Sequence, residues 1–165
     1  MKKKVSIKTV LLLEVVVFVL VFLANLIVNT GAEGLNAVGN YIDVPSILFI
    51  FLVTVPALWV TGMGKDFLRA FSVGEQPYSL RQLKRSLEAV QMVQRLIPCG
   101  AGISGLIAIV VLLSRLDDYS VLGPNLAVAN LVVFYMFILE FLLLPLKAHV
   151  QNAITDLMDV EDEEA

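Results

Sequence analysis

The sequence predicts an all-α, polytopic membrane protein that crosses the bilayer four times. Of its 165 residues, 58% are hydrophobic and only 16% are charged, a balance outside the usual range of a soluble domain. A membrane-spanning helix needs about 20 predominantly apolar residues. The stretches that meet this need are residues 9–28, 44–64, 96–114 and 121–146. We therefore expect a four-span membrane domain over residues 1–153, followed by an acidic tail over residues 154–165.

The first apolar stretch, residues 9–28, follows a run of lysines at the start of the chain. Its apolar core is longer than the roughly 7–15 residues of a signal-peptide core, and no small-residue cleavage site follows it. We expect it to be an uncleaved membrane anchor.

The second stretch carries two prolines and a tryptophan. Pro45 stands in the first turn, where a helix tolerates proline, whereas Pro56 lies inside the stretch and is expected to kink it. Trp59 is placed as an interfacial anchor. We expect this helix to continue out of the bilayer through Asp66–Phe71 and to end at the VGEQPY segment.

Residues 65–95 are the only sizeable segment outside the membrane. Ser79 and Gln82 have the spacing of a capping box, which predicts a helix start. Leu80, Leu83 and Leu87 then recur at helical spacing, as on an amphipathic helix. We expect this helix to run directly into the third span.

Lysine and arginine residues set the predicted orientation, because they are enriched in cytoplasmic segments. They are Lys2, Lys3, Lys4 and Lys8 before the first span, Lys65, Arg69, Arg81, Lys84, Arg85 and Arg95 before the third, and Lys147 after the fourth. Both termini are therefore expected in the cytoplasm. The acidic residues of the tail are typical of a solvated, disordered segment.

Several function classes find no support in the sequence. Cys99 is the only cysteine and His149 the only histidine, so neither a disulfide within the chain nor a metal site is expected. The sequence has no phosphate-binding loop and no Ser/His/Asp set, and nothing in it suggests nucleic acid. We expect no enzymatic activity and no cofactor.

Two ionisable residues, Glu14 and Glu140, fall inside predicted spans, where such groups are costly and point to function. Each lies roughly 10 Å along its helix from a lysine, at about 1.5 Å per residue, so both belong at similar depth in the inner leaflet. They predict either a proton relay or cation-handling pair, or contacts to a lysine, tyrosine, backbone or subunit partner.

The facing halves of the third and fourth spans hold Ser104 and Asn130, with small residues beside Ser104 in GAGISG. Small residues let another helix approach closely. Ser104 and Asn130 are candidates either to line a narrow polar strip between the two spans or to form hydrogen bonds between helices.

The last third of the chain resembles the third and fourth membrane helices of the flagellar stator protein MotA, in the MotA/TolQ/ExbB proton-channel superfamily. The resemblance is carried by IPCGAGISGLIAIV, LDDYSVLGPNLAVANLVVFY and LLLPL, and extends to YIDVPSILFIF and KDFLRAF. The residues that match the helix-four block are Gly123, Pro124, Ala127, Val128, Ala129, Phe134 and Tyr135.

The resemblance implies a multi-pass protein of the bacterial cytoplasmic (inner) membrane that forms a pentameric ring. The third and fourth helices of each copy would surround a helix pair from a single-span MotB/TolR/ExbD-like partner, which supplies the acidic residue that carries H⁺ or Na⁺. Pro98 and Pro145 match the two family prolines that couple ion passage to movement.

The chain departs from the family at the residues that line the ion path. Gly105 stands at the position of the helix-three threonine, with Ser104 beside it, and Val132 and Val133 replace the helix-four threonines. The candidates for the ion path are thus Ser104, Gly105, Asn130, Val132 and Val133. The large rotor-engaging domain of MotA is also missing between the second and third spans.

Two alternatives follow from the same residues. The missing threonines favour a non-conducting structural oligomer of the same fold. The LLLEV sequence around Glu14 resembles a small four-span proton-coupled antiporter, although residues 65–95 and the LDD-to-FY block have no place in one.

Overall fold

A computed structural model describes residues 6–30, 38–114, 116 and 119–163. The helices are α1 (Ile7–Thr30), the 3-10 helix η2 (Val38–Tyr41), α3 (Val44–Val60), α4 (Gly64–Ala70), α5 (Leu80–Leu113) and α6 (Tyr119–Glu163). Four helices are long and apolar enough to cross a membrane, as in a multi-pass membrane protein. The prediction of an all-α chain with four helices able to span a membrane is confirmed for the described residues. The two aspartates at 117–118 in the LDD motif, the lysines at 2–4 and residues 164–165 of the tail lie outside the described residues.

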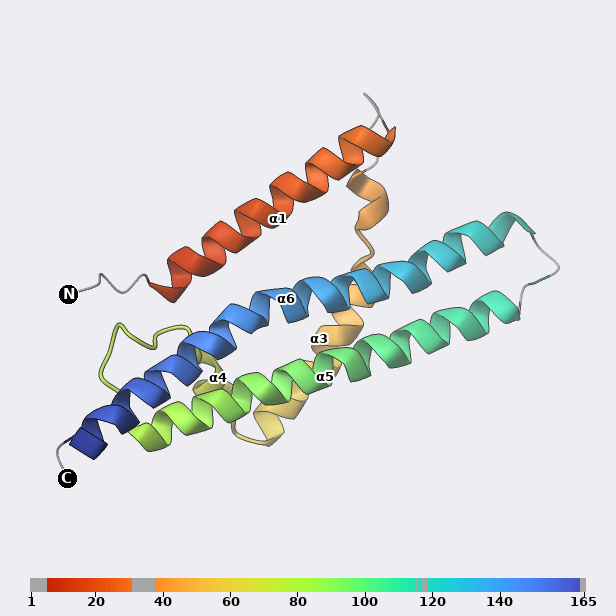
Figure 1. Ribbon diagram of the computed structural model, residues 1–165. Coiled ribbons are helices and arrows are strands. Elements are labelled where there is room, and N and C mark those ends of the chain that lie inside the picture. The colour runs from red at the N-terminus through yellow and green to blue at the C-terminus, as the bar shows by residue number, and fades with distance from the viewer. Residues whose placement is uncertain (1–5, 31–37, 115, 117–118, 164–165) are drawn as a thin grey trace.

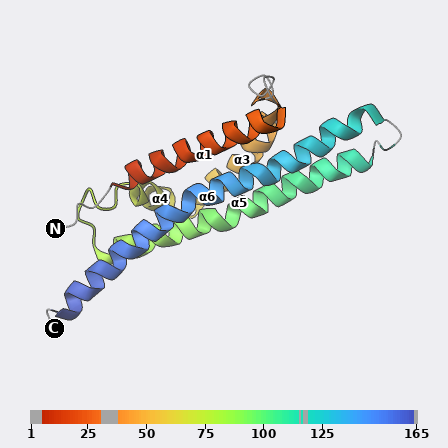
Figure 2. The same ribbon diagram turned by 45° about the horizontal axis from the view of Figure 1, so that its top comes forward.

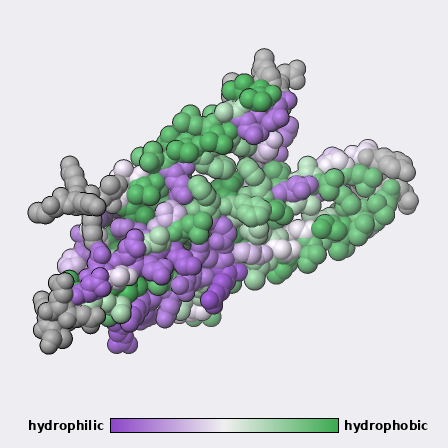
Figure 3. Space-filling model, in the orientation of Figure 1, coloured by the Kyte–Doolittle hydropathy of each residue, from purple (hydrophilic) through white to green (hydrophobic). Residues whose placement is uncertain are grey.

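The most extensive interface between two described helices joins α5 and α6, which run antiparallel as a helical hairpin (Figures 1 and 2). On this pair, α1 packs beside α6, and α3 packs mainly beside α5. The beginning of α1 and the end of α6 lie at the same end of the bundle (Figure 1). Hydrophilic side chains gather at this end, and hydrophobic side chains cover α1 and the far half of the hairpin (Figure 3).

The helix expected from the capping box runs into the third span without a break. The Ser79 hydroxyl accepts the Gln82 N–H at 3.4 Å, and the Gln82 side-chain oxygen accepts the Ser79 N–H at 3.0 Å. From this start α5 continues for 34 residues, or about 51 Å, which exceeds the roughly 30 Å hydrocarbon thickness of a bilayer. The part of α5 before the third span therefore stands outside the apolar layer.

The second span ends earlier than predicted, and the expectation of one helix through Asp66–Phe71 is wrong. Gly62 adopts a left-handed conformation with φ of 70°. The N–H of Gly62 then donates to Trp59 O and that of Met63 to Leu58 O, both at 3.0 Å. This is a Schellman motif, which ends α3 before α4 begins in a new direction.

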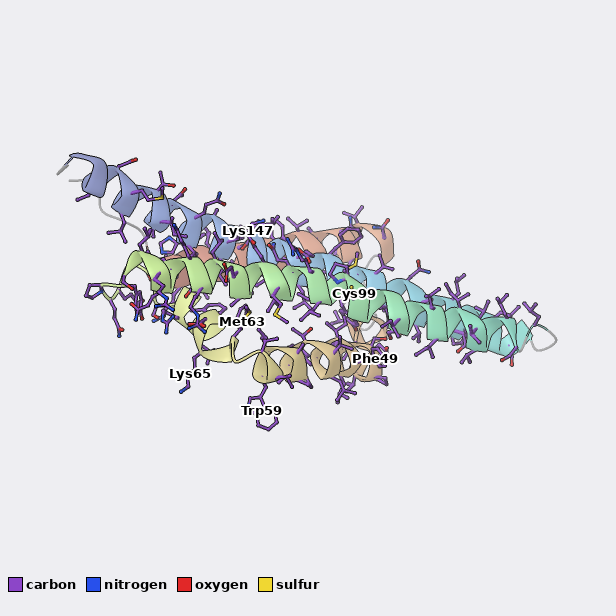
Figure 4. All side chains as sticks on the ribbon, turned by 90° about the horizontal axis from the view of Figure 1, so that it is seen from below. Phe49, Trp59, Met63, Lys65, Cys99 and Lys147 are labelled. Atoms are coloured by element: carbon purple, nitrogen blue, oxygen red, sulfur yellow. The ribbon has the colours of Figure 1, made fainter. Side chains whose placement is uncertain are left out.

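The exposed Trp59 side chain points away from the bundle (Figure 4). Its expected contact with the membrane interface stays a prediction.

The fourth long helix extends well beyond the predicted span. Its backbone is helical as far as Glu163, over most of the tail at residues 154–165 that we expected to be disordered. Val150 and Ile154 belong to the same buried cluster as Leu83 and Val90 of α5. Burial of these apolar side chains against α5 explains why the helix does not stop at the end of the apolar stretch.

The short helix α4 is held by a buried carboxylate. Asp66 is 4% exposed and pairs with Arg69 of its own helix and, at 3.0 Å, with Arg85 of α5. In the following turn, the Val73 carbonyl lies 2.9 Å from Nε2 of His149 on α6. These contacts tie the segment after the second span to both helices of the hairpin.

Two serines of the same region should respond in opposite ways to replacement by alanine. Ser86 is fully buried, and its hydroxyl has no hydrogen-bond partner among the described residues. We expect Ser86→Ala to raise the free energy of unfolding by about 1 kcal/mol, because it removes an unsatisfied buried polar group. Ser79→Ala should lower it by about 1 kcal/mol through loss of the cap. Denaturation in micelles followed by circular dichroism measures both, and equal destabilisation by the two changes would contradict the burial of Ser86.

Glu75, which lies between α4 and α5, connects this segment to the start of α1. Its carboxylate accepts hydrogen bonds from Lys8 at 2.8 Å and from Ser6 at 3.3 Å. The hydrogen bond from Lys8, helped by the lysine charge and by Ser6, lowers the pKa of Glu75 below its ordinary value of 4.5. The contact therefore contributes stability above the unfolded-state pKa, which is lost as pH falls through the lowered folded-state pKa.

A carboxyl-carbon NMR titration in micelles should place the midpoint of Glu75 below 4.5. In Lys8→Gln the midpoint should return toward that value, whereas the control Lys84→Gln should leave it unchanged. The same midpoint in the wild type and in Lys8→Gln would show that the Lys8–Glu75 contact does not form.

Candidate functional site

One side of the α5–α6 hairpin forms an exposed surface that we call the open face. Residues three or four apart share one side of a helix, and two such rows run along the hairpin. The row on α5 is Gln91, Arg95, Pro98, Gly102, Gly105 and Ile109, and the row on α6 is Asn130, Val133, Phe137, Glu140, Leu144 and Lys147. All of these residues are exposed or half-buried. Members of both rows line a common cavity at one end, so the two rows lie on the same side of the pair.

The small residues of this face leave room for another helix. A Cβ atom added to Gly102 or Gly105 would meet nothing within 4 Å. At Gly100 it would lie 3.5 Å from the Ile50 backbone and from Val53. Gly100 therefore serves the contact between α5 and α3 within the subunit, whereas the described residues leave the space in front of Gly102 and Gly105 open.

A polar cavity of about 380 Å³ lies at the end of the open face that contains Lys147. Its lining residues are Gln91, Gln94, Arg95, Glu140 and Lys147. Oε1 of Glu140 is buried and has no hydrogen-bond partner among the described residues. Lys147 lies on α6 above the α5 helix in Figure 4. The cavity therefore combines one carboxylate, two cations and two amides.

The other intramembrane carboxylate, Glu14, lies on α1. Its Oε2 is buried and also has no hydrogen-bond partner in the described part of the chain. Phe18, one turn along α1, borders an apolar groove that contains Glu140. Glu14 itself lines neither that groove nor the polar cavity. The two carboxylates thus lie on neighbouring helices at similar height, without a shared site.

Ser104 and Asn130 lie on different sides of the hairpin. Asn130 is exposed on the open face, and its amide donates to Leu126 O of its own helix at 2.9 Å. Ser104 is half-buried and lies one turn beyond Gly100, on the side of α5 that faces α3. Within one subunit these two residues form no common polar strip.

The two valines at the threonine positions also separate. Val132 is fully buried, and Val133 is 44% exposed on the open face. Pro98 lies on the open face, whereas Pro145 is half-buried on another side of α6, and both prolines stand inside continuous helices. The predicted residues on the open face are Pro98, Gly105, Asn130, Val133 and Glu140. Those elsewhere are Glu14, Ser104, Val132 and Pro145.

Sequence reasoning missed the polar companions of Glu140. Gln91, Gln94 and Arg95 belong to the helix that precedes the third span, and Lys147 follows the fourth. Their only sequence signal is the helical spacing of Gln91 to Arg95 and of Glu140 to Lys147. The antiparallel register of α5 and α6 is needed to bring these two groups together.

Tyr135, in the block that resembles MotA, has a structural role in this subunit. Its hydroxyl donates to the Tyr41 carbonyl and accepts the Asp43 N–H, both at 2.6 Å. Asp43 in turn caps α3 by accepting the Ser46 N–H at 3.1 Å. Phe18, Phe22 and Phe134 surround Tyr41 and Tyr135, so α1, η2 and α6 meet here, just before α3 begins.

Removal of the Tyr135 hydroxyl should weaken this junction. We expect Tyr135→Phe to lower the free energy of unfolding by about 1–3 kcal/mol, because two partly buried backbone groups lose their partner. Phe137→Leu, at an exposed site on the same helix, should change it by less than about 0.5 kcal/mol. Thermal unfolding in micelles measures both, and equal stability of Tyr135→Phe and the wild type would contradict the hydrogen-bonded junction.

Comparison with known proteins assigns no family to the chain. No protein-family model, no curated protein and no solved structure matches it.

Proposed function

We propose that this chain is a compact MotA-like subunit of an ion-driven membrane motor or energy-transducing complex. Five copies would form a ring around the helix pair of a MotB-like partner, with α5 and α6 as the inner wall. The observation that carries this proposal is the open face, where five of the residues singled out from the sequence share one exposed surface. The resemblance to MotA supplies the ring and the partner.

The centre of the open face suits close approach of a partner helix. Gly102 and Gly105 have empty space before them, and small residues are typical of helix contacts in membranes. Leu106, Val133 and Phe137 nearby are 44–64% exposed, so the isolated subunit leaves apolar surface for lipid or protein to cover.

The proposed orientation places both termini in the cytoplasm, in the inner membrane of a bacterium. It is supported by the lysines and arginines of residues 65–95 and by Lys8 and Lys147. Hydrophilic side chains gather at the end of the bundle where α1 begins and α6 ends (Figure 3). With this orientation, the polar cavity around Glu140 lies at the cytoplasmic edge of the membrane.

In this arrangement the partner supplies the acidic residue that carries H⁺ or Na⁺ past the open face. Asn130 and Glu140 are the polar groups that this subunit contributes to that surface. Pro98, inside α5 on the same face, is placed to respond to a change in the partner.

A specific observation favours the second candidate, a ring that does not conduct. The Asn130 amide is engaged by its own helix, and Val133 offers no hydroxyl on the open face. Measured flux with the partner present, lost when the partner's acidic residue is replaced, would eliminate this candidate.

Ion flux should require a MotB-like partner and the open face of this chain. Gly105→Leu should abolish flux in co-expressing cells and leave the thermal stability of the isolated subunit unchanged, because its side chain would project into the partner's space. Gly39→Leu is a matched control, since a Cβ there also meets nothing within 4 Å but the residue lies in η2.

Flux is measured by the pH or Na⁺ change inside the cells. Wild-type flux in Gly105→Leu, or flux from this chain without a partner, would contradict the proposed ring.

A further inference from the structure

We propose that the cavity around Glu140 and the apolar groove beside it form one binding site for a phospholipid that carries a phosphate and a primary amine, such as phosphatidylethanolamine. The cavity and the groove both include Glu140 in their lining, so they adjoin at this residue. The site lies within a single chain, and its lipid would occupy the part of the open face around Glu140 that the proposed ring turns toward the partner.

The polar part suits the headgroup. Arg95 and Lys147 offer positive charges to a phosphate, and Gln91 and Gln94 add amide hydrogen-bond donors. Arg95 directly precedes the third apolar stretch and Lys147 directly follows the fourth. Both cations therefore stand at the membrane edge, which is the depth of lipid phosphates.

The apolar part suits an acyl chain. The groove has a volume of about 420 Å³, and apart from Glu140 its lining residues are Phe18, Phe134, Phe137, Ile138, Phe141 and Leu144. It runs between α1 and α6, along α6 from Phe134 to Leu144 on both sides of Glu140. Phe137 is 63% exposed and Leu144 55% exposed, so the groove is open at the surface of the isolated subunit.

Glu140 selects the amine. Once a phosphate occupies Arg95 and Lys147, the neighbouring carboxylate of Glu140 pairs with a positive group rather than with a second negative one. Glu140 lines the cavity, and its Oε1 has no hydrogen-bond partner among the described residues. A primary ammonium donates such hydrogen bonds, whereas the trimethylammonium of phosphatidylcholine has no N–H and phosphatidylglycerol has no cation.

The test is a lipid titration of the full-length protein, purified in a mild detergent and followed by native mass spectrometry. Phosphatidylethanolamine, phosphatidylglycerol and phosphatidylcholine with identical acyl chains serve as probes. We expect phosphatidylethanolamine to bind about tenfold more tightly than the other two, the difference expected for one charge-assisted hydrogen bond. Equal binding of the three lipids by the wild type would overturn the proposal.

Variants show which side chains cause the preference for phosphatidylethanolamine. Glu140→Gln should abolish the preference for the ethanolamine headgroup. Arg95→Gln and Lys147→Gln should each weaken the binding of phosphatidylethanolamine about tenfold. Arg81→Gln, an exposed arginine of α5 outside the cavity, should bind as the wild type does.

Only variants with the helix content of the wild type are compared. Arg95→Gln and Lys147→Gln test the contact with the phosphate independently of each other. Unchanged lipid selectivity in Glu140→Gln, or wild-type affinity in both cation variants, would place the lipid elsewhere.

Discussion

The antiparallel contact between α5 and α6 is the constraint on which the rest of the structure depends. Val90, Val93 and Ile97 from α5 and Leu146 and Val150 from α6 are nearly or fully buried in one cluster, which lies toward the end of the bundle where α6 finishes. Both helices are longer than the roughly 30 Å apolar layer, so this cluster joins their extensions as well as their membrane parts. α1, α3 and α4 attach to this pair and leave its open face uncovered. An exposed surface on the hairpin is thus a consequence of how few helices surround it.

Most of the fold was predictable because its signals are local. Length and hydropathy identified the four spans, and the Ser79–Gln82 pair placed the start of α5. The break after α3 was missed because the apolar pattern continues past Gly62, although a glycine there followed by Gly64 is itself a helix-end signal. The extension of α6 was missed for a different reason. Its acidic residues suggested solvation, whereas burial of Val150 and Ile154 against α5 is a tertiary effect.

The candidate site was predictable only in part, for a geometric reason. Adjacent residues on a helix point about 100° apart, so Ser104 and Gly105, or Val132 and Val133, point in different directions. A sequence motif assigns neighbouring positions to one site. The structure separates them, with Val133 on the open face and Val132 in the core. The cavity around Glu140 needed the register between α5 and α6, which no single helical pattern contains.

The central claim is that the open face is the inner wall of a ring around a partner. The mass of the intact complex, extracted from native membranes and measured without dissociation, tests it most directly. Our account predicts five copies of this chain together with a second, single-span chain. A single copy, or a complex of this chain that holds no second protein, would contradict it.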